Sequence, residues 1–589
     1  MVTRLTRPSK RSVASRRRCR HWLSAPRGQS VGFRPGAGLW RLAWSVPIFV
    51  ALLGLAAGTR IGLAINGAID PDESEHLHAA WLVSAGLVPY RDFWDHHAPL
   101  FFYAMAPLTR WLTDNPSVYL VGRALMLVAA AATLALLYRL ARRLGPVAAG
   151  ATTLAFVFLP RIVEKTTEVR PDGPALAAWL AAVLCVVRWR ERRRGLWMAG
   201  LWLGLAVALN LKALYGGVGL FLSVALAVRR GHVARPDGEG GAAGGSVASA
   251  VVSLASATLV VPAAVTGWLL WTGGWAGLGA SARELGANLA FVDFGREWPV
   301  ADAALGFLLL AVGGVTLVIR RHASGVLAHP LHGPLLLPTV SAALILLVPT
   351  TPGVARHAWL PVMAGLSVYA GLAWEEMTRL GPGRVRPLLA VVAAVAVFVV
   401  PAVNAVQNAL RPANDAQLAL MQAMLDRACP GEAVLDGTAL YVFRPAAYRY
   451  RVLINGVQGW LDRGVVREGE VLADVRAARP PVAYADSRVR RVPGVAAFVS
   501  DHYVPDPSGV EVLGVRVDVP AGRPSGHARV ELLASGAYRV SAERTLHVSI
   551  DGAMINRGVV ALAAGTHEVG WQGVGGRITL AALSCREPR

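Results

Sequence analysis

The residues best suited to chemistry form an acidic cluster within residues 69–75, where four carboxylates occupy six consecutive positions. Crowded negative charge in a low dielectric raises the basicity of a carboxylate, so one of this cluster can take a proton from a hydroxyl group. A second interpretation is a solvated loop in which Asp72 or Ser74 caps the helix that follows. The spacing alone does not separate the two interpretations.

A second segment, residues 86–100, combines aromatic and ionisable side chains. The aromatic residues are typical of a loop anchored at the membrane interface, whereas the polar ones suit a re-entrant or surface helix that lines a cavity. His96 and His97, with Asp92 and Asp95, are of types that bind metal ions. Their spacing matches no established ligand pattern, so we predict no metal ligands, and the need for a divalent metal stays open.

Basic side chains enter in a third segment, residues 164–174. Lys165 and Arg170 are suited to bind a phosphate group, and Asp172 is suited to orient one of them. An ordinary connecting loop, followed by a helix that starts at Pro171, accounts for the same pattern. Both interpretations place the segment between two apolar stretches.

Composition indicates which class of protein carries these segments. Of the 589 residues, 54% are hydrophobic and 16% are charged, whereas soluble proteins contain about 25% charged residues. About eleven apolar stretches lie between residues 43 and 405, several of them near the roughly 20 residues needed to cross a bilayer. We therefore predict a polytopic α-helical membrane protein, preceded by a disordered, basic cytoplasmic tail at residues 1–42.

The charged residues set the expected orientation. The formal net charge is +22, and the arginines cluster between apolar stretches, which favours cytoplasmic loops over nucleic-acid binding. With a cytoplasmic N-terminus and eleven spans, these clusters face the cytoplasm and the acidic segments face outward. Residues 350–357 then also face outward, and Arg356 in that segment is suited to bind an anionic group.

The C-terminal region is too polar for lipid and is expected on the extracytoplasmic side. We predict an α/β region at residues 406–530, with a helix at residues 415–428. A β-sandwich-like module follows at residues 531–589, where short strand patterns alternate with turn signals. Cys429 and Cys585 both lie in this region and are expected to pair if the compartment is oxidising.

Taken together, the segments resemble the GT-C superfamily of polytopic glycosyltransferases, in the branch that contains protein O-mannosyltransferases and the aminoarabinose transferase of lipid A. The resemblance rests on Asp72-Glu73, the Gly-x-x-Pro-Tyr-x-Asp element at residues 86–92, and Pro99-Leu100. Further matches are Arg170-Pro171-Asp172, Arg356-His357 and residues 434–445. His97 stands where many relatives carry a lysine.

The resemblance implies a membrane enzyme that moves a sugar from a polyprenyl-phosphate donor to a hydroxyl group of a lipid, glycan or protein, with inversion, on the outer face of the cell membrane. It implies Asp72 as the general base, with Asp70 as an alternative, and Glu73 and Asp172 as positioning groups. The substrate-binding residues it implies are Tyr90, Asp92, His97, Lys165, Arg170 and Arg356.

Two other functions are compatible with the sequence. One is a transporter or lipid flippase, although such a protein should carry ionisable residues within its spans and often an internal repeat. The other is a membrane anchor that displays the C-terminal module. That module is expected either to bind glycan or only to cap the protein.

Overall fold

The structure is a computed structural model of the chain. It describes residues 35–159, 164–192, 195–229, 246–289, 305–322, 325–349, 351, 355–379, 400–449, 455–543, 545–555 and 557–584. The chain divides into two units, Met1–Gly54 and Leu55–Arg589, and the features below belong to the second. Residues 1–34 of the expected basic tail lie outside the described part, and helix α1 (Pro35–Asn66) already starts within the range expected for the tail.

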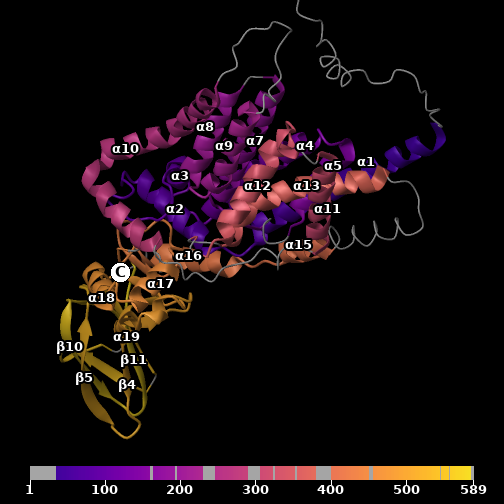
Figure 1. The fold of residues 1–589 in the computed structure, drawn as a ribbon. Helices are drawn as coiled ribbons and strands as arrows, with labels where there is room; N and C mark the ends of the chain where they lie inside the picture. The colour runs from indigo at the N-terminus through magenta and orange to yellow at the C-terminus, as the bar shows by residue number, and fades with distance from the viewer. Residues whose placement is uncertain are drawn as a thin grey trace, which may run out of the picture. The chain divides into compact units, whose positions relative to one another are not determined.

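The N-terminal two thirds of the chain is helical (Figure 1). After α1, its α-helices are α2 (Pro71–Ser84), α3 (Leu100–Trp111), α4 (Val118–Ala141), α5 (Pro146–Val157), α7 (Asp172–Arg192), α8 (Leu196–Leu209), α9 (Ala213–Arg229), α10 (Val247–Leu289), α11 (Leu305–His322), α12 (His332–Leu347), α13 (Leu360–Arg379) and α15 (Val400–Leu410).

Several of these helices have the length and composition of membrane spans. Within the described residues, the segments that qualify are Phe49–Asn66, Val118–Ala141, Asp172–Arg192 and Val247–Trp275. Shorter apolar helices accompany them at Pro146–Val157, Leu196–Leu209, Ala213–Arg229 and His332–Leu347. The predicted class, a polytopic helical membrane protein, is confirmed, and the number of eleven spans stays a prediction.

Helix α7 lies at the centre of the largest apolar core, where it contacts α4, α8 and α9. Its side chain Trp179 is fully enclosed. A Cβ atom at Gly216 of α9 would lie 2.6 Å from the indole nitrogen of Trp179, so the close approach of the two helices requires a glycine there. This packing fixes the first residue of α7 and the turn before α9, and both carry polar side chains of the site.

A second apolar core joins the first polar segment to the C-terminal region. It contains Leu77 of α2, Phe102 of α3 and Tyr119 of α4, together with Met424 and Tyr441 from the C-terminal region. Because these buried side chains come from distant parts of the sequence, the core holds the start of α2 in one place relative to the rest of this unit.

The C-terminal region combines short helices with two sheets. Its α-helices are α16 (Asp415–Arg427), α17 (Asn455–Asp462), α18 (Glu468–Ala478) and α19 (Pro493–His502). Its strands are β1 (Val434–Asp436), β2 (Val482–Tyr484), β3 (Tyr503–Pro505), β4 (Glu511–Val519), β5 (Ser525–Leu532), β6 (Gly536–Ala542), β7 (His547–Ile550), β8 (Ala553–Met554), β9 (Gly558–Leu562), β10 (Gly565–Gln572) and β11 (Gly576–Ala582).

One sheet has seven strands in the order β1-β2-β4-β11-β6-β9, with β3 paired to β4, and the other has four in the order β5-β10-β7-β8. Alternate residues of both sheets, among them Val540 and Trp571, share one apolar core, as in a β-sandwich. The first sheet runs on from the α/β part without interruption, and β5 crosses the boundary that we predict at residue 530. Cys429 is disulfide-bonded, whereas Cys585 lies outside the described residues, so their pairing stays a prediction.

Candidate active site

The site begins at the first turn of α2, and Asp70 determines how that turn is capped. Its carboxylate accepts a hydrogen bond from the backbone N–H of Asp72 (3.0 Å), and Glu73 accepts one from the N–H of Asp70 (3.1 Å). With Pro71 as the first helical residue, this is a capping box. The expectation that Asp72 or Ser74 caps the helix was therefore wrong. As a result, the Asp72 side chain is free to face the neighbouring loop.

Glu73 is fully buried and all its contacts are structural. Its carboxylate binds the guanidinium of Arg123 at 2.9 Å and 2.6 Å, and it accepts a hydrogen bond from the N–H of Val169 at 2.9 Å. Arg123 also donates to backbone carbonyls at the end of α1, including those of Ala64 and Gly67. Glu73 thus ties α1, α2, α4 and the loop before α7 together.

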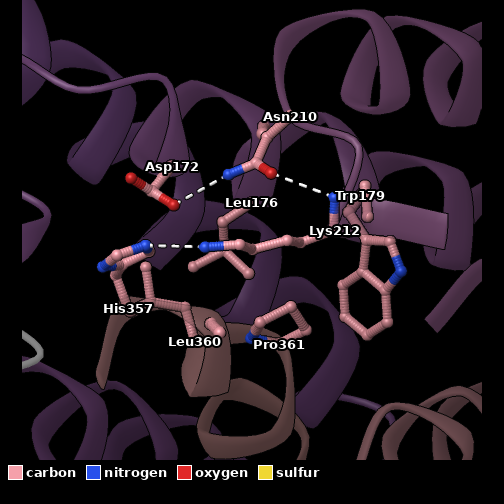
Figure 2. A pocket seen from close by; sticks show the side chains of 11 residues that line it. Asp172, Leu176, Trp179, Asn210, Lys212, His357, Leu360 and Pro361 are labelled. Atoms are coloured by element: carbon pink, nitrogen blue, oxygen red, sulfur yellow. Dashed lines mark hydrogen bonds between the residues drawn. The ribbon is translucent and has the colours of Figure 1, made fainter. Parts of the chain in front are cut away.

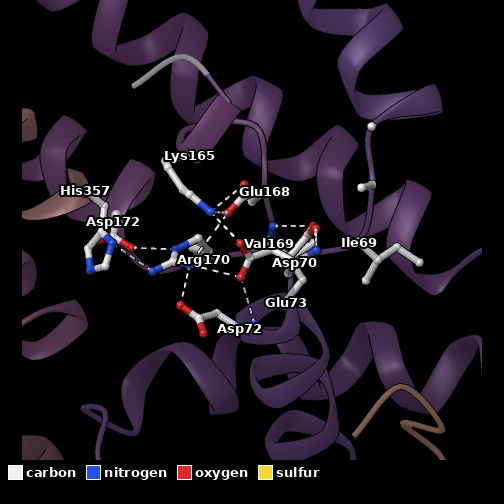
Figure 3. A network of polar contacts seen from close by, with 12 residues as sticks. Ile69, Asp70, Asp72, Glu73, Lys165, Glu168, Val169, Arg170, Asp172 and His357 are labelled. Carbon is white, nitrogen blue, oxygen red and sulfur yellow. Dashed lines mark hydrogen bonds and ion pairs between the residues drawn. The ribbon is translucent and has the colours of Figure 1, made fainter. Parts of the chain in front are cut away.

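Arg170 occupies the centre of a polar network that joins two loops (Figure 3). Its buried guanidinium lies 2.5 Å from the carboxylate of Asp72, donates to Asp172 at 3.1 Å and contacts Nδ1 of His357 at 3.1 Å. Asp72 of the first segment therefore meets Arg170 of the third segment, which also binds Asp172. The Asp72 side chain keeps 34% of its surface exposed, so it is open to a ligand.

The charge of Arg170 decides the ionisation of Asp72. Burial of this carboxyl favours its neutral form, but the adjacent guanidinium outweighs that effect and holds the pKa of Asp72 well below its usual value. Asp72 is therefore an anion at neutral pH. The carboxylate is a weak base while its ion pair with Arg170 is intact. If another anion binds Arg170 and weakens this ion pair, the basicity of Asp72 increases.

A further group of polar residues lies on the other side of Asp172 (Figure 2). Asn210 donates to Asp172 at 2.8 Å, and its own side-chain oxygen accepts from the N–H of Lys212 at 3.0 Å. Nζ of Lys212 lies 2.9 Å from Nε2 of His357. The sequence analysis did not select Asn210 or Lys212, because they stand in a short turn between two apolar stretches without a recognisable motif.

The protonation of His357 follows from its two neighbours. Arg170 is always charged and can only donate, so Nδ1 accepts from it. Burial lowers the pKa of His357, which favours a neutral imidazole, and burial also lowers the pKa of Lys212. The site thus places the permanent positive charge of Arg170 near a lysine whose charged form is disfavoured by burial.

This part of the site opens into a small cavity of about 30 Å³. Its wall is polar at one end and apolar at the other. The polar end is formed by Asp172, Asn210, Lys212 and His357, and the apolar end by Leu176, Trp179, Leu360 and Pro361.

Lys165 forms ion pairs with two carboxylates, which the sequence analysis did not predict. Its ammonium binds Asp70 at 2.5 Å and Glu168 at 2.9 Å. One lysine cannot compensate both anions fully. Burial and the charge of Asp70 therefore outweigh Lys165 and raise the pKa of Glu168 to about 8. These residues line a separate pocket of about 420 Å³ that also contains Asn408.

The residues expected in the second segment serve mainly its own conformation. Tyr90 has a positive φ of 68° and donates its hydroxyl to the carbonyl of His97 at 2.6 Å. Asp92 accepts from the N–H of Val88 at 2.7 Å and pairs with Arg91. His97 is hydrogen-bonded to Asp95. Residues 86–99 form turns rather than the helix that we considered.

Arg356 begins the short helix η3 (Arg356–Trp359), where its backbone is described. Its side chain lies outside the described part of the structure, so its expected role in anion binding stays a prediction. Its neighbour His357 contacts Arg170.

Comparisons with known proteins agree with this architecture. Residues 96–237 match the family model described as dolichyl-phosphate-mannose-protein mannosyltransferase. No curated protein matches the sequence. Among solved structures, the fold is similar to that of ArnT from Cupriavidus metallidurans bound to undecaprenyl phosphate, with a TM-score of 0.51 and 12% identity over 80% of this chain and 98% of that chain.

Two further solved structures are similar at lower TM-scores. The Archaeoglobus fulgidus oligosaccharyltransferase tethered with an acceptor peptide has a TM-score of 0.45 and 12% identity over 79% of this chain and 74% of that chain. The arabinosyltransferase EmbB from Mycobacterium smegmatis has a TM-score of 0.39 and 12% identity over 91% of this chain and 64% of that chain.

Fold and site define a polytopic membrane protein with polar loops gathered around a buried arginine. The family model and the likeness to ArnT confirm the predicted resemblance to the GT-C superfamily, in the branch of the O-mannosyltransferases and the aminoarabinose transferase. The chain accordingly has a GT-C-like fold, and its residues 96–237 are similar to the mannosyltransferase family.

Proposed function

We propose that the enzyme transfers a sugar from a polyprenyl-phosphate donor to a hydroxyl-bearing acceptor at the extracytoplasmic face, with inversion of configuration and Asp72 as the general base. One observation carries the proposal. A partly exposed, ionised carboxylate at the start of α2 lies 2.5 Å from the buried guanidinium of Arg170, which comes from a different loop. A base and an anion-binding group thus stand side by side, as a displacement on a glycosyl phosphate requires.

In the proposed reaction, the acceptor hydroxyl gives its proton to Asp72 while its oxygen attacks the anomeric carbon. The bond between that carbon and the phosphate oxygen breaks, and its electron pair stays with the departing phosphate. Arg170 stabilises the charge that develops on this phosphate. A phosphate that engages Arg170 weakens its contact with Asp72, so donor binding raises the pKa of the base when it is needed.

Lys212 is the second cationic group that we assign to the phosphate. Burial lowers the pKa of Lys212 in the resting site, and an anion nearby favours its charged form. Asp172 positions Arg170 through the 3.1 Å contact and Lys212 through Asn210. Glu73 and Lys165 are assigned to holding the loops in place.

The choice of donor is supported by the comparisons. ArnT is described as bound to undecaprenyl phosphate, and the matching family model is named for dolichyl-phosphate-mannose.

The test is sugar transfer in membranes that contain the purified protein, with undecaprenyl-phosphate hexoses and pentoses carrying a tritiated sugar. Asp72→Asn is expected to lower transfer by about 10²–10⁴-fold, the range of general-base catalysis, with normal expression and insertion. Lys212→Met is expected to weaken donor binding. Glu191→Gln, at an exposed ion pair with Arg143, is the matched control and should transfer at the wild-type rate. Wild-type transfer by Asp72→Asn would remove the base from the proposal.

A further inference from the structure

Four side chains with metal-binding groups converge beside α2, outside the network of Arg170. Glu75 comes from α2, and Asp95, His96 and His97 come from the turns that precede α3. Each offers one ligand atom, and these atoms all lie within 4.8 Å of one another. We propose that Glu75, Asp95, His96 and His97 bind one divalent transition-metal ion, with zinc as the best match. The proposal rests on these side chains and does not depend on the proposed function.

Glu75 supplies the first reason, because its carboxylate is buried without a full partner. The residue is only 2% exposed, and its Oε2 atom has no hydrogen-bond partner. Among the described residues, the cationic group paired with it is the imidazole of His96, at 3.4 Å from Oε1. A buried carboxylate is costly unless a charge or several hydrogen bonds compensate it. A divalent cation would supply that charge.

The second reason is the distance between the donor atoms. Asp95 Oδ1 lies 3.0 Å from Nδ1 of His97 and 4.0 Å from Nδ1 of His96. Zinc bonds to nitrogen and oxygen of about 2.0–2.1 Å place the donors of a tetrahedral site about 3.3 Å apart. The widest pair in the cluster, at 4.8 Å or less, would therefore close by at most about 1.5 Å, which side-chain rotation supplies.

The donor set decides which ion fits. Two imidazole nitrogens with two carboxylate oxygens suit zinc and its first-row neighbours, whereas Mg²⁺ and Ca²⁺ prefer oxygen ligands alone. Two carboxylates also match the charge of a divalent ion. Metal-ligating imidazoles must be deprotonated, so binding should release protons.

The ion would fasten the second polar segment to α2. His97 also lies against His76 of α2, with ring centroids 4.5 Å apart, and its N–H donates to Asp95 at 2.8 Å. A metal bridge between Glu75 and the histidines would thus add a fixed link between two segments that also meet through ring contacts, an ion pair and a shared apolar core.

A second histidine cluster provides an internal competitor for the experiment. His322, His329 and His332 also present ligand atoms within 4.8 Å of one another. That cluster contains no carboxylate, and it lies between α11 and α12, in a different part of the chain. Its substitution therefore separates binding at the proposed site from binding to histidines in general.

The test is zinc binding to the detergent-purified full-length chain after removal of metals with a chelator. Calorimetry is expected to give one saturable site, with proton release, and zinc should raise the thermal unfolding midpoint. Glu75→Gln and His96→Asn are expected to weaken this site by about 100-fold or more, since even outer-sphere changes weaken metal sites by about 10–100-fold. His329→Ala should leave it intact.

Three results would overturn the proposal. They are the absence of a saturable zinc site in the wild type, unchanged affinity in both Glu75→Gln and His96→Asn, and loss of the site in His329→Ala. Size-exclusion profiles identify a variant that fails to fold. Glu75→Gln guards against that outcome in a second way, because removing a buried, poorly paired charge should not destabilise the metal-free protein. The metal proposal is tested by zinc binding alone. Sugar transfer by the metal-free protein would support the proposed function and would not bear on the metal site.

Discussion

The carboxylate of Glu73 is predicted to hold the site together rather than to act on substrate. The change to test is Glu73→Gln, which keeps the volume of the side chain and one acceptor oxygen but removes its charge. In the wild type both oxygens face Arg123, at 2.9 Å and 2.6 Å, and the backbone of Val169 donates to the same group. After the change, the guanidinium of Arg123 remains buried without its counter-charge.

The expected magnitude follows from that burial. Arg123 is 1% exposed and Glu73 is fully enclosed, and removal of one partner of a buried ion pair costs about 3–5 kcal/mol. The free energy of unfolding should fall by that amount. The carbonyls of Ala64 and Gly67 still accept from Arg123, so we expect the lower end of the range. The matched control, Glu191→Gln, breaks an ion pair whose side chains are 27% and 33% exposed, and should change stability by less than about 1 kcal/mol.

The assay is unfolding in mixed detergent micelles, followed by tryptophan fluorescence, beside sugar transfer in membranes. If Glu73 has only a structural role, Glu73→Gln lowers the stability of the protein. Its activity per folded molecule then falls less than that of Asp72→Asn. The opposite result would refute the reasoning: a variant as stable as the control but about 100-fold less active would show that Glu73 acts on the substrate or on the base.

Two further predictions concern pH and topology. Because the pKa of Glu168 is raised to about 8 from 4.5, its stabilising contribution is complete below pH 4.5 and is lost as pH rises through about 8. The unfolding free energy of the wild type should therefore decline across this interval more steeply than that of Glu168→Gln, and parallel curves would contradict the shift. A reporter fused after residue 405 should report the extracytoplasmic side, and a cytoplasmic signal would place the proposed site on the opposite face.

The sequence predicted the parts of the fold that repeat a local pattern over several residues. The short strand patterns expected within residues 531–589 correspond to strands that include β6, β10 and β11. The predicted helix at residues 415–428 is α16. Strands β1 and β2 have only three residues each and are largely buried, so they show no alternation by which they could have been found.

The site residues could be predicted where a loop contains clustered charged residues next to a proline. Asp72 comes from one predicted segment and Arg170 with Asp172 from another, and Arg170 lies within hydrogen-bonding distance of both carboxylates. Lys212 could not be predicted, because its partner His357 is 145 residues away along the chain. The two residues meet because α9, which follows Lys212, packs against α12, and α12 also contacts η3. The role of Asp70 as helix cap also depended on backbone geometry, since several neighbouring acidic residues compete for it.

The continuous seven-stranded sheet has a consequence for how this protein can be divided. Strand β4 pairs with β2 and β3 through its first residues and with β11 through the rest. It therefore belongs equally to the α/β part and to the sandwich. A cut at residue 530 would split β5 and remove β11, the strand that pairs with residues 514–519 of β4. The backbone hydrogen-bonding groups on that edge of a valine-rich strand would then have no partner. The sandwich is therefore not an independent domain. Transferring it to another protein would require including β4 and the helix α19 that packs against β4.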